Sequence, residues 1–225
     1  MDGMYIPDSA IIEDLALNYA MEIKDSKITK LLLKHGAKIS EPKLEYSHPI
    51  SKIHLPKNIK HGDIVQIGRY NDIPIEWIVL EDVDNKILLL SKEILLFMPY
   101  NNTKNPCTWE TSFLRKWLND KFLMTAFSEE EQEYLSLRLN IANKNPKYNT
   151  PSGSDTLDKV FLLDFYDLEK LNILDNYRLP WVWWLRTLGF SQKFAMNVEN
   201  KIHFGELAVD SFNVGVRPAI YLLKN

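Results

Sequence analysis

Apolar residues in the first forty positions recur at the spacing of an α-helix. One series comprises Leu15, Ala16, Tyr19, Ala20 and Ile23, and a second comprises Ile28, Leu31, Leu32 and His35. Residues three and four positions apart share one face of a helix, so each series predicts a short amphipathic helix. Gly36 follows the second series, where helices commonly end in a left-handed residue. Residues 1–40 are therefore predicted to form a small helix pair.

From residue 62 onward the pattern changes to short strand-like runs. These runs lie at 62–70, 73–80, 86–91, 160–163, 181–186, 194–198, 201–204, 207–209 and 214–223. The Asp84-Asn85 pair between the second and third runs is typical of a tight hairpin turn. Strands at both ends with helices between them predict an α+β domain over 62–225, in which the first and last strands share one sheet system.

Helices are expected between these two sets of strands. Phe113 and Trp117 stand at helical spacing within 109–127, which predicts one amphipathic helix. Ser128-Glu-Glu-Glu131 has the sequence of a capping box, so a second helix should begin at about Glu129. Asp164 is expected to cap the N-terminus of a short helix that ends near Leu171.

Three polar stretches separate these elements. Residues 41–61 contain Pro42, Pro49 and Pro56 without a clear period, which predicts a linker. Residues 99–108 are polar and rich in turn formers. Residues 143–158 contain almost no apolar side chain, which predicts a long exposed loop.

The segment Trp181–Arg186 contains three of the six tryptophans. In a strand, Trp181 and Trp183 would face one way while Trp184 and Arg186 face the other. Neither face could be left in water without a large free-energy cost. We therefore expect a central strand here.

Charge and composition narrow the range of partners. The chain has 27 basic and 30 acidic side chains, so no charge excess favours nucleic acid. No apolar run is long enough to span a bilayer and no signal-peptide pattern is seen, which predicts a soluble, cytoplasmic protein without a membrane partner. Cys107 is the single cysteine and permits no internal disulfide. The histidines are too widely spaced for a zinc site, so no metal is expected.

A series of short segments resembles a bacterial family of domains of unknown function (domain of unknown function 6273). The segments are Gly62–Tyr70, Pro74–Trp77, Leu88–Ser91, Thr108–Ser112, Leu114–Asn119, Val160–Leu163, Trp183–Arg186 and Gly215–Ala219. That family is similar to the C-type-lectin-like fold of formylglycine-generating enzymes and of the variable binding proteins of diversity-generating retroelements. The resemblance covers about residues 60–223. It implies a C-type-lectin-like domain of short antiparallel strands and two main helices, and it supplies no activity.

A second resemblance concerns the helix pair. Residues Ile28–Ala37 resemble part of one ankyrin repeat, without the usual Thr-Pro-Leu-His opening and without a second copy. One such repeat cannot bury its apolar face alone. The ankyrin-like helices should therefore pack on the same chain or on a protein partner.

The resemblance to the C-type-lectin-like fold also suggests two kinds of chemistry to look for, cysteine-based catalysis and calcium binding. Formylglycine-generating enzymes use a pair of active-site cysteines, whereas Cys107 stands alone. Asn119 and Asp120 are too few to supply the six or more oxygens that a calcium ion needs. We therefore assign no catalytic residue and no cofactor.

Arg186 and Arg217 are the remaining candidates, because a guanidinium among large apolar side chains must find carboxylates or carbonyls. In one interpretation they form a salt-bridge network, with Glu76, Glu110 and Asp164 as the candidate partners. In the other they bind an anionic ligand in a cleft near Arg186. The candidate ligand-binding residues are Arg186, Trp184, Trp181, Arg217, Glu76 and Glu110.

Three functions are consistent with the sequence. The first is a non-catalytic binding module for a ligand or a protein, with loops 99–108 and 143–158 as its recognition surface. The second is an enzyme that uses the cleft near Arg186, with Glu76 or Glu110 as acid or base. The third is an assembly protein that docks through its ankyrin-like helices.

Overall fold

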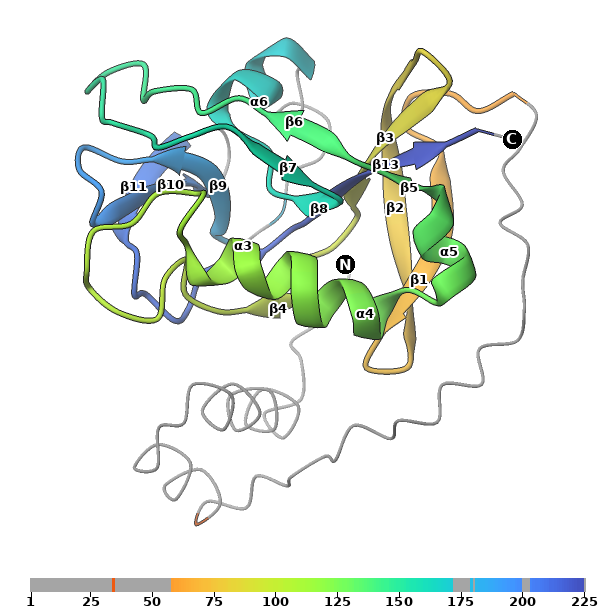
Figure 1. Ribbon diagram of the computed structural model, residues 1–225, viewed down its shortest axis with the longest axis horizontal. Coiled ribbons are helices and arrows are strands. Elements are labelled where there is room, and N and C mark those ends of the chain that lie inside the picture. The colour runs from red at the N-terminus through yellow and green to blue at the C-terminus, as the bar shows by residue number, and fades with distance from the viewer. Residues whose placement is uncertain (1–33, 35–57, 172–178, 180, 200–202, 225) are drawn as a thin grey trace, which may run out of the picture. The chain divides into compact units, whose positions relative to one another are not determined.

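The computed structural model describes residue 34 and residues 58–171, 179, 181–199 and 203–224. Residues 58–224 form a mixed α+β, sheet-rich domain with few helices and curled, mostly antiparallel sheets, as Figure 1 shows. The predicted helix pair over 1–40, Lys34 aside, lies outside the described residues, and so does most of the predicted linker over 41–61.

The first sheet joins the beginning of this domain to its end. β1 (Ile64–Tyr70), β2 (Ile73–Val83) and β3 (Lys86–Ser91) form an antiparallel meander. β13 (Ala219–Leu223) pairs with β3 so that Ile220 lies opposite Leu89. β5 (Leu135–Ser136) and β8 (Val160–Phe161) also pair with β13. The prediction that the first and last strands share one sheet system is confirmed.

Two-residue turns connect the strands of this meander. Asp84 and Asn85, between β2 and β3, have φ angles of 51° and 63°, and Asn71 and Asp72, between β1 and β2, have φ angles of 50° and 63°. Positive φ at both central residues is the geometry of a type I′ turn, whose twist matches that of the flanking strands. The predicted hairpin turn at Asp84-Asn85 is confirmed.

The second sheet has the tryptophan segment at its centre. Its strand order is β11 (His203–Ala208), β10 (Phe194–Glu199), β9 (Trp183–Leu188), β12 (Gly215–Val216) and β4 (Leu96–Phe97). The predicted central strand is therefore present, but it begins at Trp183. Trp181 precedes it and packs edge-on against Phe97 of the edge strand β4, with centroids 6.0 Å apart. This position at the edge of the sheet leaves the Trp181 side chain 44% exposed. The prediction that Trp181 belongs to the strand is wrong.

One long helical segment packs against the first sheet. α3 (Phe113–Trp117), η1 (Leu118–Phe122) and α4 (Leu123–Ala126) run end to end (Figure 1), and Ser112 Oγ caps the start by accepting the Arg115 N–H at 3.2 Å. α4 approaches β1 at Gly68, which has a φ of +71°, and an added Cβ would lie 2.7 Å from the Ala126 carbonyl oxygen. The helix predicted within 109–127 is confirmed from residue 113 onward.

Both predicted caps are also confirmed. α5 (Glu129–Tyr134) begins at Ser128, whose Oγ accepts the Glu131 N–H while Glu131 accepts the Ser128 N–H. α6 (Phe165–Leu171) begins after Asp164, whose Oδ1 accepts the Asp167 N–H at 2.7 Å. Each side chain satisfies a backbone donor that the first turn of a helix leaves without an intrahelical partner.

Residues 143–158 do not form a wholly exposed loop. β7 (Thr156–Asp158) pairs with β6 (Arg138–Asn140), and Asn145 and Thr150 are buried. Asn145 Nδ2 donates to the Leu188 carbonyl at 2.8 Å, and Thr150 Oγ1 donates to the Gly189 carbonyl at 2.6 Å. The prediction is wrong because these polar side chains bond to distant backbone rather than to water.

Candidate functional site

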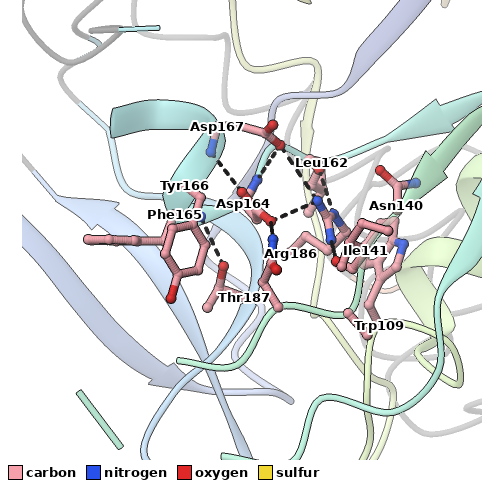
Figure 2. A network of polar contacts seen from close by, with 12 residues as sticks. Trp109, Asn140, Ile141, Leu162, Asp164, Phe165, Tyr166, Asp167, Arg186 and Thr187 are labelled. Carbon is pink, nitrogen blue, oxygen red and sulfur yellow. Dashed lines mark hydrogen bonds and ion pairs between the residues drawn. The ribbon is translucent and has the colours of Figure 1, made fainter. Parts of the chain in front are cut away.

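Arg186 lies inside the domain and is the hub of a polar network (Figure 2). Its Nη2 lies 2.9 Å from Asp164 Oδ2 and 3.6 Å from Asp167 Oδ2. Its Nη1 and Nε donate to the carbonyls of Ile141 and Leu162, at 2.8 and 3.3 Å. These contacts satisfy a buried guanidinium, and they fasten β9 to the start of α6 and to the chain after β6.

The carboxylates of this network have further partners. Asp164 Oδ2 also accepts from Asn143 Nδ2 at 3.0 Å, and Asp167 also pairs with Arg138. Burial alone would raise the pKa of Asp167, but the positive charges of Arg138 and Arg186 outweigh burial and hold that pKa below its ordinary value. Asp167 therefore stays ionised at neutral pH, and both aspartates act as structural partners of the arginines.

Arg217 belongs to a different part of the structure. Its Nε donates to the Ser91 carbonyl at 2.9 Å and its Nη2 to the Lys92 carbonyl at 3.2 Å, and its guanidinium lies 5.2 Å from the Trp183 ring centroid. Burial lowers the pKa of Arg217 to about 10, so the side chain remains charged at neutral pH. Arg217 links β3 to the segment between β12 and β13.

Among the described residues, the other predicted site residues make the following contacts, which involve neither the Arg186 nor the Arg217 guanidinium. Trp184 is buried and its Nε1 donates to the Met98 carbonyl at 2.9 Å. Glu76 pairs with Lys92 at 2.7 Å, and this hydrogen bond lowers the pKa of Glu76. Glu110 accepts the Ser154 N–H at 3.0 Å, and the ring of Trp181 contacts Phe97. Of the two interpretations of Arg186, these contacts favour the salt-bridge network.

Cys107 is poorly suited to nucleophilic chemistry. The side chain is buried, and burial raises the pKa of its thiol to about 12. Because the thiolate is the reactive form, only a minute fraction of Cys107 is activated at neutral pH.

An open cavity of about 520 Å³ lies between α6, the β10–β11 hairpin and the loop after β6. Its lining residues are Asn145, Pro146, Lys147, Tyr148, Phe165, Met196, Phe204 and Glu206. On the hairpin, Met196 pairs with Glu206, and Phe204 lies two residues from Glu206 on the same face. Phe165, the first residue of α6, packs on Phe204 with centroids 4.8 Å apart.

The loop wall of the cavity is held by Asn145. While its Nδ2 binds the end of β9, its Oδ1 accepts the N–H groups of Lys147 and Tyr148 at 2.9 and 3.1 Å. This side chain thereby fixes the turn that places Lys147 and Tyr148 at the rim. The size of the cavity is within the range of small-molecule sites, and its lining of aromatic residues with a few polar groups is typical of them.

The cavity contains one ammonium and one carboxylate. Lys147 Nζ lies 4.8 Å from the Tyr148 ring centroid, and Glu206 Oε2 accepts the Phe190 N–H at 3.0 Å. A hydrogen bond with Tyr148 and the negative charge of Glu206 raise the pKa of Lys147. None of these residues was among the six candidate ligand-binding residues, although Lys147 and Tyr148 lie in loop 143–158, which was predicted to form part of a recognition surface. Two signals could have identified them: Tyr148 is isolated in a polar loop, and Phe204 and Glu206 share one strand face.

Comparisons with known proteins place the chain in a family without assigning an activity. Neither the curated proteins nor the solved structures include a match to this sequence. In the part of the chain that the structure describes, no helix is both long and apolar enough to cross a membrane. A family model described as "Domain of unknown function (DUF6273)" matches residues 84–224, which include β3, the helical segment and the whole second sheet. The chain therefore belongs to the family of domains of unknown function DUF6273.

Proposed function

We propose that residues 62–225 form a non-catalytic binding module that holds its ligand in the cavity between α6, the β10–β11 hairpin and residues 145–148. The observation that carries the proposal is the cavity itself, with a volume of about 520 Å³ and walls of Tyr148, Phe165 and Phe204. Aromatic side chains contribute large apolar contact areas with few rotatable bonds, which favours ligand binding.

The proposal includes a C-type-lectin-like fold for this domain. Its support is the resemblance of segments such as Trp183–Arg186 and Gly215–Ala219, together with the adjacency of β3 and β13. Because one fold can carry binding or catalysis, the function has to rest on the site and not on the fold.

The non-catalytic part rests on the state of the reactive groups. Cys107 is buried with a pKa of about 12, and the carboxylates of Asp158 and Asp164 are occupied by hydrogen bonds. Asp158, for instance, accepts from Arg115 and from Trp109, at 2.8 and 3.0 Å. These bonds give both carboxylates a structural role, and neither carboxylate lines the cavity.

A matched pair of exposed aromatic residues tests the proposal. Tyr148 and Trp181 are 41% and 44% exposed, but only Tyr148 lines the cavity. The full chain, labelled with ¹⁵N, would be titrated with a panel of named probes: phenol, indole, choline, propionate and glucose. We expect at least one probe to shift the amide signals of Phe204 and Glu206, and Tyr148→Ala but not Trp181→Ala to weaken that binding. No shift at these amides with any probe, or weakening by Trp181→Ala alone, would refute the proposal.

A further inference from the structure

The charges around the cavity, together with its rings, indicate the kind of ligand it takes. The β11 strand places the Glu206 carboxylate on the same face as the Phe204 ring. The Phe190 N–H bonds to Glu206 Oε2 and orients the carboxylate without neutralising its charge. Glu206 is the single anionic side chain among the residues that line the cavity.

The aromatic residues, like this carboxylate, favour a positively charged ligand. Tyr148, Phe165 and Phe204 line the cavity, and Phe190 packs edge-on against Tyr148 with centroids 6.2 Å apart. The faces of aromatic rings carry partial negative charge and attract cations. A carboxylate beside several rings therefore favours a positively charged, partly apolar group over an anion.

Lys147 shows this preference within the protein itself. Its Nζ lies 4.8 Å from the centroid of the Tyr148 ring, at the rim of the cavity. The side chain is exposed, and the negative charge of Glu206 attracts it as well. Because the Lys147 side chain is exposed and has several rotatable bonds, a cation from outside can take the place of its ammonium.

We propose that the cavity binds an alkylammonium group, which takes the place of the Lys147 ammonium against the Tyr148 ring and beside the Glu206 carboxylate. This inference rests on the proposed function and specifies its ligand class. The group can belong to a free small amine or to a lysine side chain of a peptide, because both present the same charge on an apolar stem.

The test compares two probes of the same shape. Choline carries a trimethylammonium group, and 3,3-dimethylbutan-1-ol is its neutral isostere. We expect choline to bind about fivefold or more tightly than the isostere, since a cation–π contact with its neighbouring carboxylate adds roughly 1 kcal/mol or more. The readout is the shift of the Phe204 and Glu206 amide signals in the full chain.

Two substitutions have opposite expected effects. Lys147→Ala removes the competing ammonium and should tighten choline binding, whereas Glu206→Gln should weaken it. Glutamine can still accept the Phe190 N–H, so this variant keeps the bond that orients residue 206. The controls are Lys104→Ala and Glu133→Gln, which change the net charge equally at exposed positions outside the cavity lining. Weaker choline binding by Lys147→Ala would overturn the proposal.

A third arm separates the two sources of the cation. A short peptide with one central lysine would be compared with choline and with the same peptide acetylated at that lysine, which removes the charge. Tighter binding of the unmodified peptide than of choline assigns the cation to a protein side chain, and the reverse assigns it to a small molecule. If the two peptides bind equally and choline binds no more tightly than its isostere, the proposed preference for a cation is overturned, while the proposed binding function stands. No binding by any probe overturns both.

Discussion

The buried Arg186 network offers the sharpest test of how the domain is held together. Arg186→Met keeps a flexible apolar side chain of comparable length but removes the charge and every donor. It leaves the Asp164 carboxylate with two of its partners, and it leaves the Ile141 and Leu162 carbonyls without the guanidinium. The Arg186 side chain is only 4% exposed, so water cannot readily replace it.

The expected loss in the free energy of unfolding follows from these contacts. Removing one partner of a buried ion pair destabilises a protein by about 3–5 kcal/mol, because the other charge stays buried. Asp167 retains Arg138, which argues for the lower end of this range. A loss of about 3 kcal/mol corresponds to a fall in melting temperature of roughly 6–12 °C for a domain of this size.

The assay is urea unfolding followed by tryptophan fluorescence, with the matched variant Lys170→Met as control. Lys170 forms an ion pair with Glu81 at 3.0 Å, but its side chain is 68% exposed. Such a pair contributes less than about 1 kcal/mol. If Arg186→Met lowers the free energy of unfolding by no more than Lys170→Met does, the network is not a structural clamp and our interpretation of Arg186 is wrong.

Two further predictions concern titratable groups. The pKa of Asp167 in the folded state lies below its ordinary value, so its contribution to stability is complete above that ordinary value and is lost as pH falls through the folded pKa. Below about pH 4, the free energy of unfolding should therefore fall less steeply with decreasing pH in Asp167→Asn than in the wild type. Urea unfolding at several pH values would measure this free energy, and the same dependence on pH in both proteins would contradict the prediction. For Cys107, burial raises the pKa of the thiol to about 12 from an ordinary 9. Iodoacetamide at pH 8 should therefore modify the folded protein about a thousandfold more slowly than the urea-unfolded chain. Mass spectrometry would measure both rates, and equal rates would refute the argument that burial suppresses the thiolate.

Local signals in the sequence predicted local structure well. The cap at Ser128, the cap at Asp164 and the turn at Asp84-Asn85 each depend on contacts within a few residues, and all three are present. The sharing of one sheet by the first and last strands was also predicted, because strands flanked a helical region on both sides. These features follow from periodicity and from side-chain hydrogen bonds to nearby backbone.

The features that the sequence did not predict depend on distant partners. Asn145 is buried because it bonds to the end of β9, and no spacing rule within residues 143–158 indicates that contact. The cavity brings Phe165, Phe204 and Glu206 together from two separate elements, so the site exists only after folding. The prediction placed the site at arginines and tryptophans, whereas most of those side chains are buried in the scaffold.

The position of β13 has a consequence for how the protein is made. β13 fills the place beside β3, yet the ribosome synthesises it after every other strand of both sheets. Until it emerges, the apolar residues Ile87–Leu90 belong to a strand with one open edge, which can pair with a neighbouring nascent chain. The first sheet can therefore be completed only after β13 has been synthesised, and overexpressed chains should depend on chaperones to keep that edge apart.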